Sequence, residues 1–332
     1  LWRLRVTVPG ALSLNLGFVR YRLPASGRLA LYPADRPADG LVFDAADNAD
    51  HGELCTPVLL TDDLVVELVV DAAERRLVDL ELGRVGRGYR LFGEDRTDKA
   101  DACNRDVICP EGDPWRSEIA AVGRFHYGGS KICTGTLLNN TSLDRRPLFL
   151  SAAHCTDGVA ATSVVVYWNF ESPNCGDLGD GNEDDVQSGG TIRAQWGDPD
   201  PQAPIVTSDL LLVELDDVPP PAYAVAYAGW NRQEEPPTSA VCIHHPTGDE
   251  KCISFEDDPV TVTSYVGDVS PGDGNHLRVD DWDLGTTQVG SSGSGLFGPD
   301  HRLVGTLRGG YAACGNDEPD WYGRLFDQWE GG

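Results

Sequence analysis

The sequence predicts an all-β protein made of two folded units. Short apolar segments recur along the whole chain, glycines and prolines separate them, and no stretch shows sustained helical periodicity. The chain has 332 residues, of which 40% are hydrophobic, and this is enough for two units that each bury a core. Its 38 glycines and 22 prolines follow no repeat, which excludes a collagen-like array.

The first unit, residues 1–92, is predicted to be a β-sandwich. Its apolar segments alternate or are rich in β-branched residues and leucine, and turn residues separate them at the spacing of a sandwich. The expected strands lie at 2–8, 14–23, 58–70 and 76–82, with turns at 24–27 and 33–40. Residues 93–102 are polar with few exceptions and are predicted to be a linker, which contains Lys99.

The second unit, residues 103–332, shows the same strand pattern. The expected strands lie at 119–125, 132–138, 148–153, 163–170, 210–215, 240–245, 260–266, 276–279, 303–307 and 322–326. So many short strands with turns between them predict a double β-barrel or a large sandwich. The acidic segment 177–185 resembles a calcium loop in composition only, because Asp185 stands where that loop needs glycine. We interpret it as a solvated loop, with weak calcium binding as the alternative.

Charge and cysteine content narrow the range of partners and compartments. The net charge is −27, and residues 100–332 hold 13 basic against 37 acidic residues, which argues against a nucleic-acid partner. No run of 18 apolar residues is present, so no membrane association is expected. Eight of the nine cysteines follow residue 100 without paired CxxC spacing, which favours disulfides over zinc and predicts a secreted protein. Because the chain begins at Leu1 without methionine, a signal peptide is expected to have been removed or left out.

Three segments together suggest nucleophilic catalysis. His154 follows an apolar strand, Asp209 begins another, and Ser294 lies in the glycine-rich segment 290–297. A serine nucleophile needs a neutral imidazole as base and a carboxylate that orients the imidazole, and the order His, Asp, Ser is one known solution. Ser294 is therefore the predicted nucleophile, and the amides of Ser292 and Ser294 are the predicted oxyanion hole. Each segment alone is more typical of a turn, a packed core residue or a strand cap.

The second unit resembles the bacterial lysyl endopeptidases, a branch of the chymotrypsin-like serine proteases. The matching motifs are Asp106–Asp113, Cys133–Thr141, Ala153–Cys155, Val164–Asn169, Thr207–Leu210, Ala228–Asn231, Ile243–Pro246, Gly290–Ser294 and Tyr322–Arg324. The resemblance implies two six-stranded β-barrels with the site in the cleft between them. His154 and Asp209 would come from the first barrel and Ser294 from the second.

The same resemblance implies three disulfides, Cys103–Cys314, Cys109–Cys175 and Cys133–Cys155. Cys242 and Cys252 flank a short segment and have no counterpart in the family, so we expect a fourth bond between them. Cys55 is left without a partner. His244 and His245 match a family motif, but a histidine pair without a third ligand is more typical of a hydrogen-bonded turn than of a metal site.

Substrate-binding residues are also implied by the resemblance. Asp320 stands where the family keeps the aspartate that pairs with a substrate lysine, although a surface carboxylate in an acidic loop is the alternative. Gly309 and Gly310 would present backbone for the substrate to pair with. Arg308 departs from the family, which has a histidine there, and Tyr265 lies in roughly the region of that histidine's tryptophan partner.

Residues 1–92 resemble the β-rich propeptide of such proteases, and Lys99 is the predicted processing site. The expected function is therefore a secreted, monomeric serine endopeptidase that hydrolyses proteins or peptides after lysine, without a metal or another cofactor. Two alternatives stay open. One is a trypsin-like protease with arginine or broad basic preference, and the other is an inactive protease-like binding module.

Overall fold

The computed structural model describes residues 1–88, 100–127, 131–156, 161–176, 181–197 and 208–331. Lys99 and residues 93–99 of the predicted linker lie outside these ranges. Within them the protein is all-β, as predicted, with four sheets and two short α-helices, α1 (Arg116–Ile119) and α2 (Leu325–Gly331). No helix in these ranges is long and apolar enough to cross a membrane.

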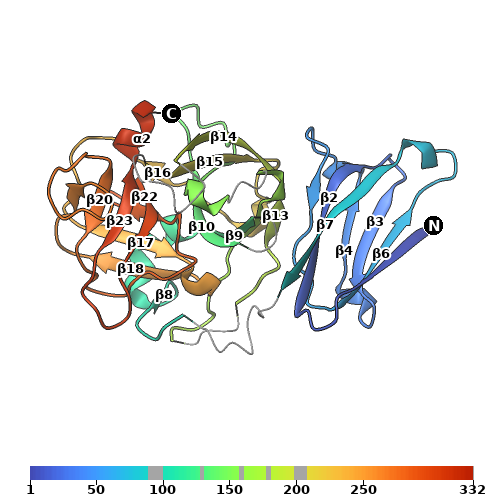
Figure 1. The fold of residues 1–332 in the computed structure, drawn as a ribbon, viewed down its shortest axis with the longest axis horizontal. Helices are drawn as coiled ribbons and strands as arrows, with labels where there is room; N and C mark the ends of the chain where they lie inside the picture. The colour runs from blue at the N-terminus through green and yellow to red at the C-terminus, as the bar shows by residue number, and fades with distance from the viewer. Residues whose placement is uncertain (89–99, 128–130, 157–160, 177–180, 198–207, 332) are drawn as a thin grey trace.

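The N-terminal unit is a sandwich of a four-stranded and a three-stranded sheet (Figure 1). The first has the order β1-β6-β3-β4, with β1 (Trp2–Thr7), β6 (Asp63–Val69), β3 (Arg28–Pro33) and β4 (Leu41–Asp44). The second has the order β5-β2-β7, with β5 (Leu54–Cys55), β2 (Ser13–Arg22) and β7 (Asp79–Gly88). Leu64, Val66 and Leu68 alternate along β6 and are buried, because successive strand residues face opposite sides of a sheet.

The next sheet is a curled, seven-stranded one with the order β13-β12-β9-β10-β11-β15-β14. Its strands are β9 (Val122–Tyr127), β10 (Lys131–Leu138), β11 (Leu148–Ser151), β12 (Val165–Tyr167), β13 (Val186–Ser188), β14 (Gly190–Trp196) and β15 (Leu210–Leu215). Aromatic side chains fill its interior, where Phe149 packs edge-on against both Phe125 and Trp168. We refer to this sheet as the first barrel.

The fourth sheet has nine strands and forms the second barrel. They are β8 (Arg105–Asp106), β16 (Gly229–Trp230), β17 (Ala240–His244), β18 (Cys252–Glu256), β19 (Thr261–Thr263), β20 (His276–Val279), β21 (Gly295–Phe297), β22 (Arg302–Gly310) and β23 (Asp320–Arg324). Both sheets exceed the expected six strands in the described residues, because short strands such as β8, β13 and β16 pair at their margins. One apolar cluster, which includes Leu150, Leu210 and Phe297, joins the two barrels.

The sandwich contacts the outer side of the first barrel, next to β13 (Figure 1). His51 Nε2 lies 2.7 Å from Asp216 Oδ2, and the Val58 N–H donates to the Tyr167 hydroxyl at 3.1 Å. Cys55 is buried between the units against Tyr167, and burial raises the pKa of its thiol to about 11. Among the described residues, no hydrogen bond from the sandwich reaches His154, Asp209 or the 290–294 segment.

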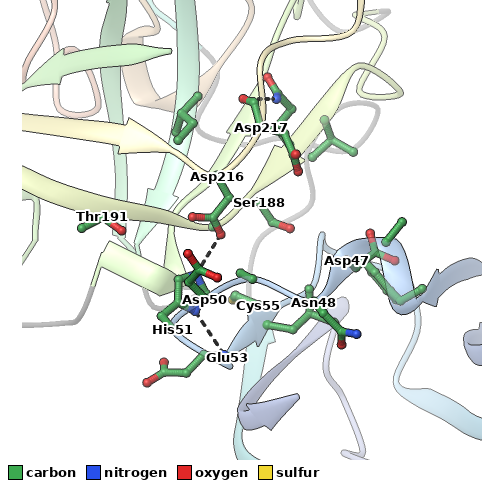
Figure 2. Close-up of a pocket in the computed structure, with 18 of the residues that line it drawn as sticks. Asp47, Asn48, Asp50, His51, Glu53, Cys55, Ser188, Thr191, Asp216 and Asp217 are labelled. Carbon is green, nitrogen blue, oxygen red and sulfur yellow. Dashed lines mark hydrogen bonds and ion pairs between the residues drawn. The ribbon is translucent and has the colours of Figure 1, made fainter. Parts of the chain in front are cut away.

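A cavity of about 790 Å³ lies along this contact. Figure 2 shows His51 pointing across it to Asp216, with the carboxylates of Asp47, Asp50 and Asp217 nearby. Burial raises the pKa of Asp216 although the hydrogen bond to His51 opposes the shift. This acidic cavity therefore belongs to the contact between the units.

Three disulfides are present, Cys103–Cys314, Cys109–Cys175 and Cys133–Cys155, the pairs that the resemblance implied. The expected Cys242–Cys252 bond is wrong, because both thiols are free and buried. The register of β17 and β18 explains this: Cys242 stands opposite Ser254, and Cys252 stands opposite His244, two residues away along each strand. Cys55 is also free, as expected.

Candidate active site

The pairing of β11 with β15 brings His154 and Asp209 together. His154 lies in the short 3₁₀ turn Ala153–Cys155 that follows β11, and Asp209 directly precedes β15. The imidazole Nδ1 lies 2.5 Å from Asp209 Oδ2, and the His154 backbone N–H donates to Oδ1 at 3.0 Å. Both carboxylate oxygens are thus engaged by one residue, which fixes the ring and places the proton on Nδ1.

Asp209 is a charged carboxylate in a buried place. The residue is 1% exposed, and burial alone would raise its pKa. The hydrogen bond from the His154 ring, the charge of that ring and the cation of Arg308 together hold the pKa of Asp209 below its ordinary value. The carboxylate is therefore ready to stabilise a positive charge on His154.

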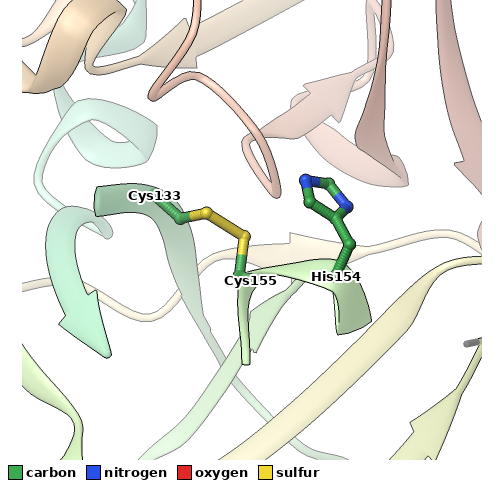
Figure 3. Close-up of side chains that lie close together, drawn as sticks. All are labelled: Cys133, His154 and Cys155. Carbon is green, nitrogen blue, oxygen red and sulfur yellow. A yellow bond between two sulfur atoms is a disulfide. The ribbon is translucent and has the colours of Figure 1, made fainter. Parts of the chain in front are cut away.

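A lysine supports the turn that carries this histidine. The Lys131 ammonium, from the start of β10, donates to the His154 carbonyl at 2.8 Å. The Cys133–Cys155 disulfide fastens the same turn to β10 (Figure 3). Cys133, His154 and Cys155 lie close enough to suggest a metal site, but both sulfurs are consumed by the disulfide, so the cluster fits no metal.

The serine-containing loop, residues 288–294, is held by both barrels. Thr134 of β10 binds it twice, since its N–H donates to the Ser292 carbonyl at 2.9 Å and its hydroxyl donates to the Gly290 carbonyl at 3.0 Å. From the other side, the Gly293 N–H donates to Leu307 of β22 at 2.8 Å. Gly293 has φ +81°, and a Cβ there would lie 1.9 Å from the Ser151 hydroxyl, so only glycine fits.

Ser294 does not occupy the position expected for a nucleophile. Its side chain has no exposed surface, and its hydroxyl lies 3.2 Å from the Cys242 sulfur, inside the second barrel. Its N–H is also engaged, because it donates to the Ser291 carbonyl at 3.0 Å. Neither the hydroxyl nor the amide is thus placed to meet a substrate.

Ser292 is the loop serine that lies beside the histidine turn. It is half-buried, and its carbonyl lies 3.8 Å from the sulfur of Cys155, the residue after His154. Its N–H and that of Gly290 donate no hydrogen bond to any described residue. A serine-protease oxyanion hole requires two such N–H groups two residues apart, one of them on the serine itself. In Figure 3 a loop approaches His154, and its faded red colour is that of the last strands of the chain.

His244 and His245 lie behind this loop and are held by hydrogen bonds, as the sequence predicts. His244 Nδ1 lies 2.7 Å from the Ser291 hydroxyl, and Nε2 lies 3.2 Å from the Ser254 hydroxyl. Burial lowers the pKa of His244 to about 3, so the ring is neutral. His245 is likewise buried, with Nδ1 2.8 Å from the Asp249 carbonyl. The support that His244 gives to Ser291 was not foreseen from the sequence.

Asp320 lies at the start of β23 and is 1% exposed. Its Oδ2 accepts from Trp282 Nε1 at 2.9 Å and from the Thr287 hydroxyl at 2.7 Å. The other oxygen, Oδ1, is buried and has no hydrogen-bond partner among the described residues. Burial raises the pKa of Asp320, although these two donors and the backbone of Ala312 act to lower it. Asp320 is therefore a buried carboxylate, and the alternative of a solvated surface acid does not apply to it.

Two glycines of β22 lie next to this carboxylate. Gly310 pairs with Asp320 across β22 and β23, and a Cβ on Gly310 would lie 2.3 Å from Asp320 Oδ1. Gly309 has φ +145° and follows a bulge in β22. In the described part of the chain, no strand pairs with the edge of Gly309 and Gly310 that faces away from β23. That edge can receive an extended peptide as an added strand.

Arg308 stacks on Tyr265, with its guanidinium carbon 4.6 Å from the ring centroid. This places the unexpected cation and the aromatic ring side by side, where the family resemblance suggested a histidine and a tryptophan. Arg308 also acts on the electrostatics of the site, since its charge contributes to the lowered pKa of Asp209. The residue therefore links the Gly309–Gly310 edge of β22 to the His154–Asp209 pair.

The two curled sheets, the His–Asp pair and the serine loop between them are those of a serine endopeptidase. A family model described as "Lysyl endopeptidase, C-terminal domain" matches residues 97–323. The lysyl endopeptidase of Pseudomonas aeruginosa is 30% identical over 94% of this chain and 69% of its own length. The chain belongs to the lysyl endopeptidase family.

Solved structures with a similar arrangement are distant. An inactive form of the Rv3671c protease of M. tuberculosis has 12% identity and a TM-score of 0.43, covering 70% of this chain and 93% of its own. A Glu endopeptidase in complex with MPD has 18% identity and a TM-score of 0.40, covering 73% of this chain and 96% of its own.

Proposed function

We propose that this protein is a secreted serine endopeptidase that hydrolyses peptide bonds after lysine. The observation that carries the lysine preference is Asp320, whose buried Oδ1 has no hydrogen-bond partner among the described residues and lies beside Gly310. An ammonium group that reaches Oδ1 would make a charge-assisted hydrogen bond with a carboxylate that is otherwise unfavourably buried. The free thiols lie buried and the other six cysteines are paired, which fits an oxidising compartment.

In this proposal the nucleophile is Ser292, with His154 as general base and Asp209 as the orienting carboxylate. His154 takes the proton of the Ser292 hydroxyl while Oγ attacks the scissile carbonyl, and then returns that proton to the leaving amine. The N–H groups of Gly290 and Ser292 receive the oxyanion, and each such donor typically lowers the barrier by about 3 kcal/mol. Water then hydrolyses the acyl-enzyme with His154 again as base. Ser294, the nucleophile expected from the sequence, would instead pack the loop against Cys242.

Labelling with a fluorophosphonate tests which serine reacts. Ser292→Ala is expected to abolish labelling and peptidase activity, whereas Ser294→Ala is expected to keep both, with lower thermal stability because a buried hydroxyl is lost. The two variants are matched controls, since each removes one hydroxyl from the same loop. Labelling that survives in Ser292→Ala and disappears in Ser294→Ala would return the role to Ser294. Absence of labelling in processed wild type would contradict the protease itself.

Specificity is tested with peptides that differ only in the residue before the scissile bond. Lysine is expected to be cleaved best, arginine less well and glutamine hardly at all, because only a cation can pair with Asp320. Comparable cleavage after lysine and glutamine would remove Asp320 from the proposed role. Cleavage after arginine equal to that after lysine would widen the specificity to basic residues.

Maturation is the last part of the proposal. Residues 1–92 would be a propeptide, removed when the enzyme cuts after Lys99. In the described part of the chain no hydrogen bond from the sandwich reaches the triad residues, which is compatible with a basal activity that makes the first cut before release. The N-terminus of secreted protein gives the test. Wild type that stays uncut at residue 99, or equal processing of His154→Ala, would exclude self-processing.

A further inference from the structure

A buried acid receives the backbone at the proposed start of the mature chain. Ala100, the residue after Lys99, is 5% exposed, and its N–H donates to Asp249 Oδ2 at 2.9 Å. Asp249 has no exposed surface, and its Oδ1 accepts from the Glu250 N–H at 3.1 Å. The first described residue of the protease unit is thus already bound inside the fold through its amide nitrogen.

Further acids surround this contact. Glu250 is buried, and burial together with the neighbouring Asp249 carboxylate raises its pKa to about 7. Asp106, also buried, is close enough for Asp249 to contribute to the raised pKa of its carboxyl. The adjacent ammonium of Lys251 lies 2.8 Å from Glu171. A further positive charge at this place would therefore be stabilising.

The acid lies in a turn that packs against the serine loop. Asp249 directly follows the 3₁₀ turn Pro246–Gly248, and the Thr247 N–H donates to the Val289 carbonyl at 2.6 Å. Gly290 has φ +98°, and a Cβ on it would lie 2.7 Å from the Gly248 nitrogen. Gly290 carries one of the two N–H groups that we assign to the oxyanion hole. Movement of the turn would consequently move an oxyanion donor.

The segment after Ala100 binds the same loop directly. Gln288 Oε1 accepts from the Asp101 N–H at 3.0 Å and from Asn104 Nδ2 at 2.8 Å. Gln288 Nε2 in turn donates to Asp101 Oδ2 at 2.7 Å. The Cys103–Cys314 disulfide anchors this segment to the second barrel. Residues 100–104 therefore connect the Asp249 turn and the beginning of the serine loop.

We propose that Asp249 is a binding site for the α-ammonium group of Ala100, and that this ion pair forms on cleavage after Lys99 and orders the oxyanion hole. The proposal rests on the proposed function for the origin of the cut. Hydrolysis of the Lys99–Ala100 bond consumes one water, leaves a carboxylate on Lys99 and converts the Ala100 amide N–H into an ammonium. A neutral hydrogen bond to Asp249 becomes a charge-assisted one, which is roughly twice as strong.

The position before Ser292 does not offer such an acid. It is Ser291, whose hydroxyl is already bound by His244, so an N-terminal ammonium has no carboxylate to meet at that residue. Asp249 reaches the same loop from a neighbouring turn. The site would therefore take a short N-terminal segment with a free amine, and its natural ligand is the chain's own residue 100.

The test uses a cut that does not depend on the protein's own activity. Arg96→Asp with Thr97→Asp turns residues 95–99 into Asp-Asp-Asp-Asp-Lys, which enteropeptidase cleaves after Lys99. In a His154→Ala background, the melting temperature is measured before and after cleavage for three chains: the parent, Asp249→Asn, and a chain with one glycine inserted after Lys99. Propeptide release is common to all three, so their differences report the ammonium.

Cleavage is expected to shift the melting temperature of the parent upward relative to both other chains by several degrees, since Asp249→Asn lacks the charge and the insertion displaces the ammonium. The same shift in all three chains would overturn the proposal.

In fully cut protein with His154 intact, Asp249→Asn is expected to lower kcat/KM about tenfold or more, while the surface control Asp113→Asn leaves it unchanged. Equal kcat/KM in Asp249→Asn and Asp113→Asn would also overturn it. Absence of peptidase activity in every chain would refute the proposed function, and the melting data would still decide the binding site.

Discussion

Asp209 and Asp320 are two carboxylates of equal burial with opposite electrostatics. Each is 1% exposed, and burial acts on both in the same direction. The His154 ring and the Arg308 cation bring the pKa of Asp209 below its ordinary value, whereas Asp320 has neutral donors from Trp282 and Thr287 and its pKa is raised. The partners of a buried acid, and not its burial, decide whether it is already satisfied or open to a cationic ligand.

The largest expected effect comes from Asp209, the buried acid that already has charged partners. Asp209→Asn should lower kcat by about 10⁴, because an amide no longer favours the tautomer with the proton on Nδ1 and cannot stabilise the imidazolium. Steady-state kinetics with a lysyl peptide give the value, and KM should change little. Asp113→Asn, on the surface, is the control. A loss of less than tenfold would mean that Asp209 does not orient the base.

The second effect comes from Asp320, the buried acid whose hydrogen-bond donors are neutral. Asp320→Asn should lower kcat/KM for lysyl peptides by roughly 10²–10³, which corresponds to the loss of a buried ion pair. Cleavage of a peptide with glutamine before the scissile bond should fall much less, because glutamine brings no charge. Asp317→Asn, an exposed acid of the same loop, is the matched control. A parallel loss for lysine and glutamine would mean that Asp320 supports the fold and does not select the substrate.

The smallest effect comes from Arg308, the cation that helps to distinguish the two acids. In Arg308→Ala the pKa of Asp209 should rise, since one of the causes that lower it is removed. A carboxyl with a higher pKa takes up its proton at a higher pH, so the titration of the Asp209 carboxyl, followed by NMR, should move upward, with at most about a threefold change of kcat/KM at neutral pH. Arg302→Ala, an exposed arginine paired with Asp300, is the control. A downward movement of the Asp209 titration would contradict this assignment.

The fold was largely predictable because most strands bury one face or both. The alternation at residues 63–69 and the apolar run at 210–215 indicate strands directly. The strands at Arg28–Pro33 and Cys252–Glu256 were not predicted. Both strands are short and lie next to turn residues or cysteines, so they contain too few residues for an alternating hydrophobic pattern to be recognised. Each pairs with a strand far away in the sequence, Arg28–Pro33 with β6 and Cys252–Glu256 with β8.

The sequence singles out His154, Asp209 and the 290–294 segment, which the structure brings together, but it does not distinguish the surroundings of each serine. Ser291, Ser292 and Ser294 share one glycine-rich segment, so residue type and spacing cannot separate them. The separation comes from long-range contacts: His244 holds Ser291, Thr134 holds the carbonyl of Ser292, and Cys242 lies against Ser294. The free thiol of Cys242 was missed for the same reason, because the register between two paired strands cannot be predicted from the spacing of two cysteines in the sequence.

The contacts of two lysines have a consequence for the lifetime of the enzyme. Beside Lys99 the chain has Lys131, whose ammonium is bound to the His154 carbonyl, and Lys251, which has no exposed surface. A protease that cuts after lysine must draw its target side chain into a pocket, and here both side chains are engaged in the fold of the protease itself. Digestion of one copy by another would then require local unfolding at these strands, so the rate of autolysis should follow the population of that locally unfolded form, and hence the stability of the barrels.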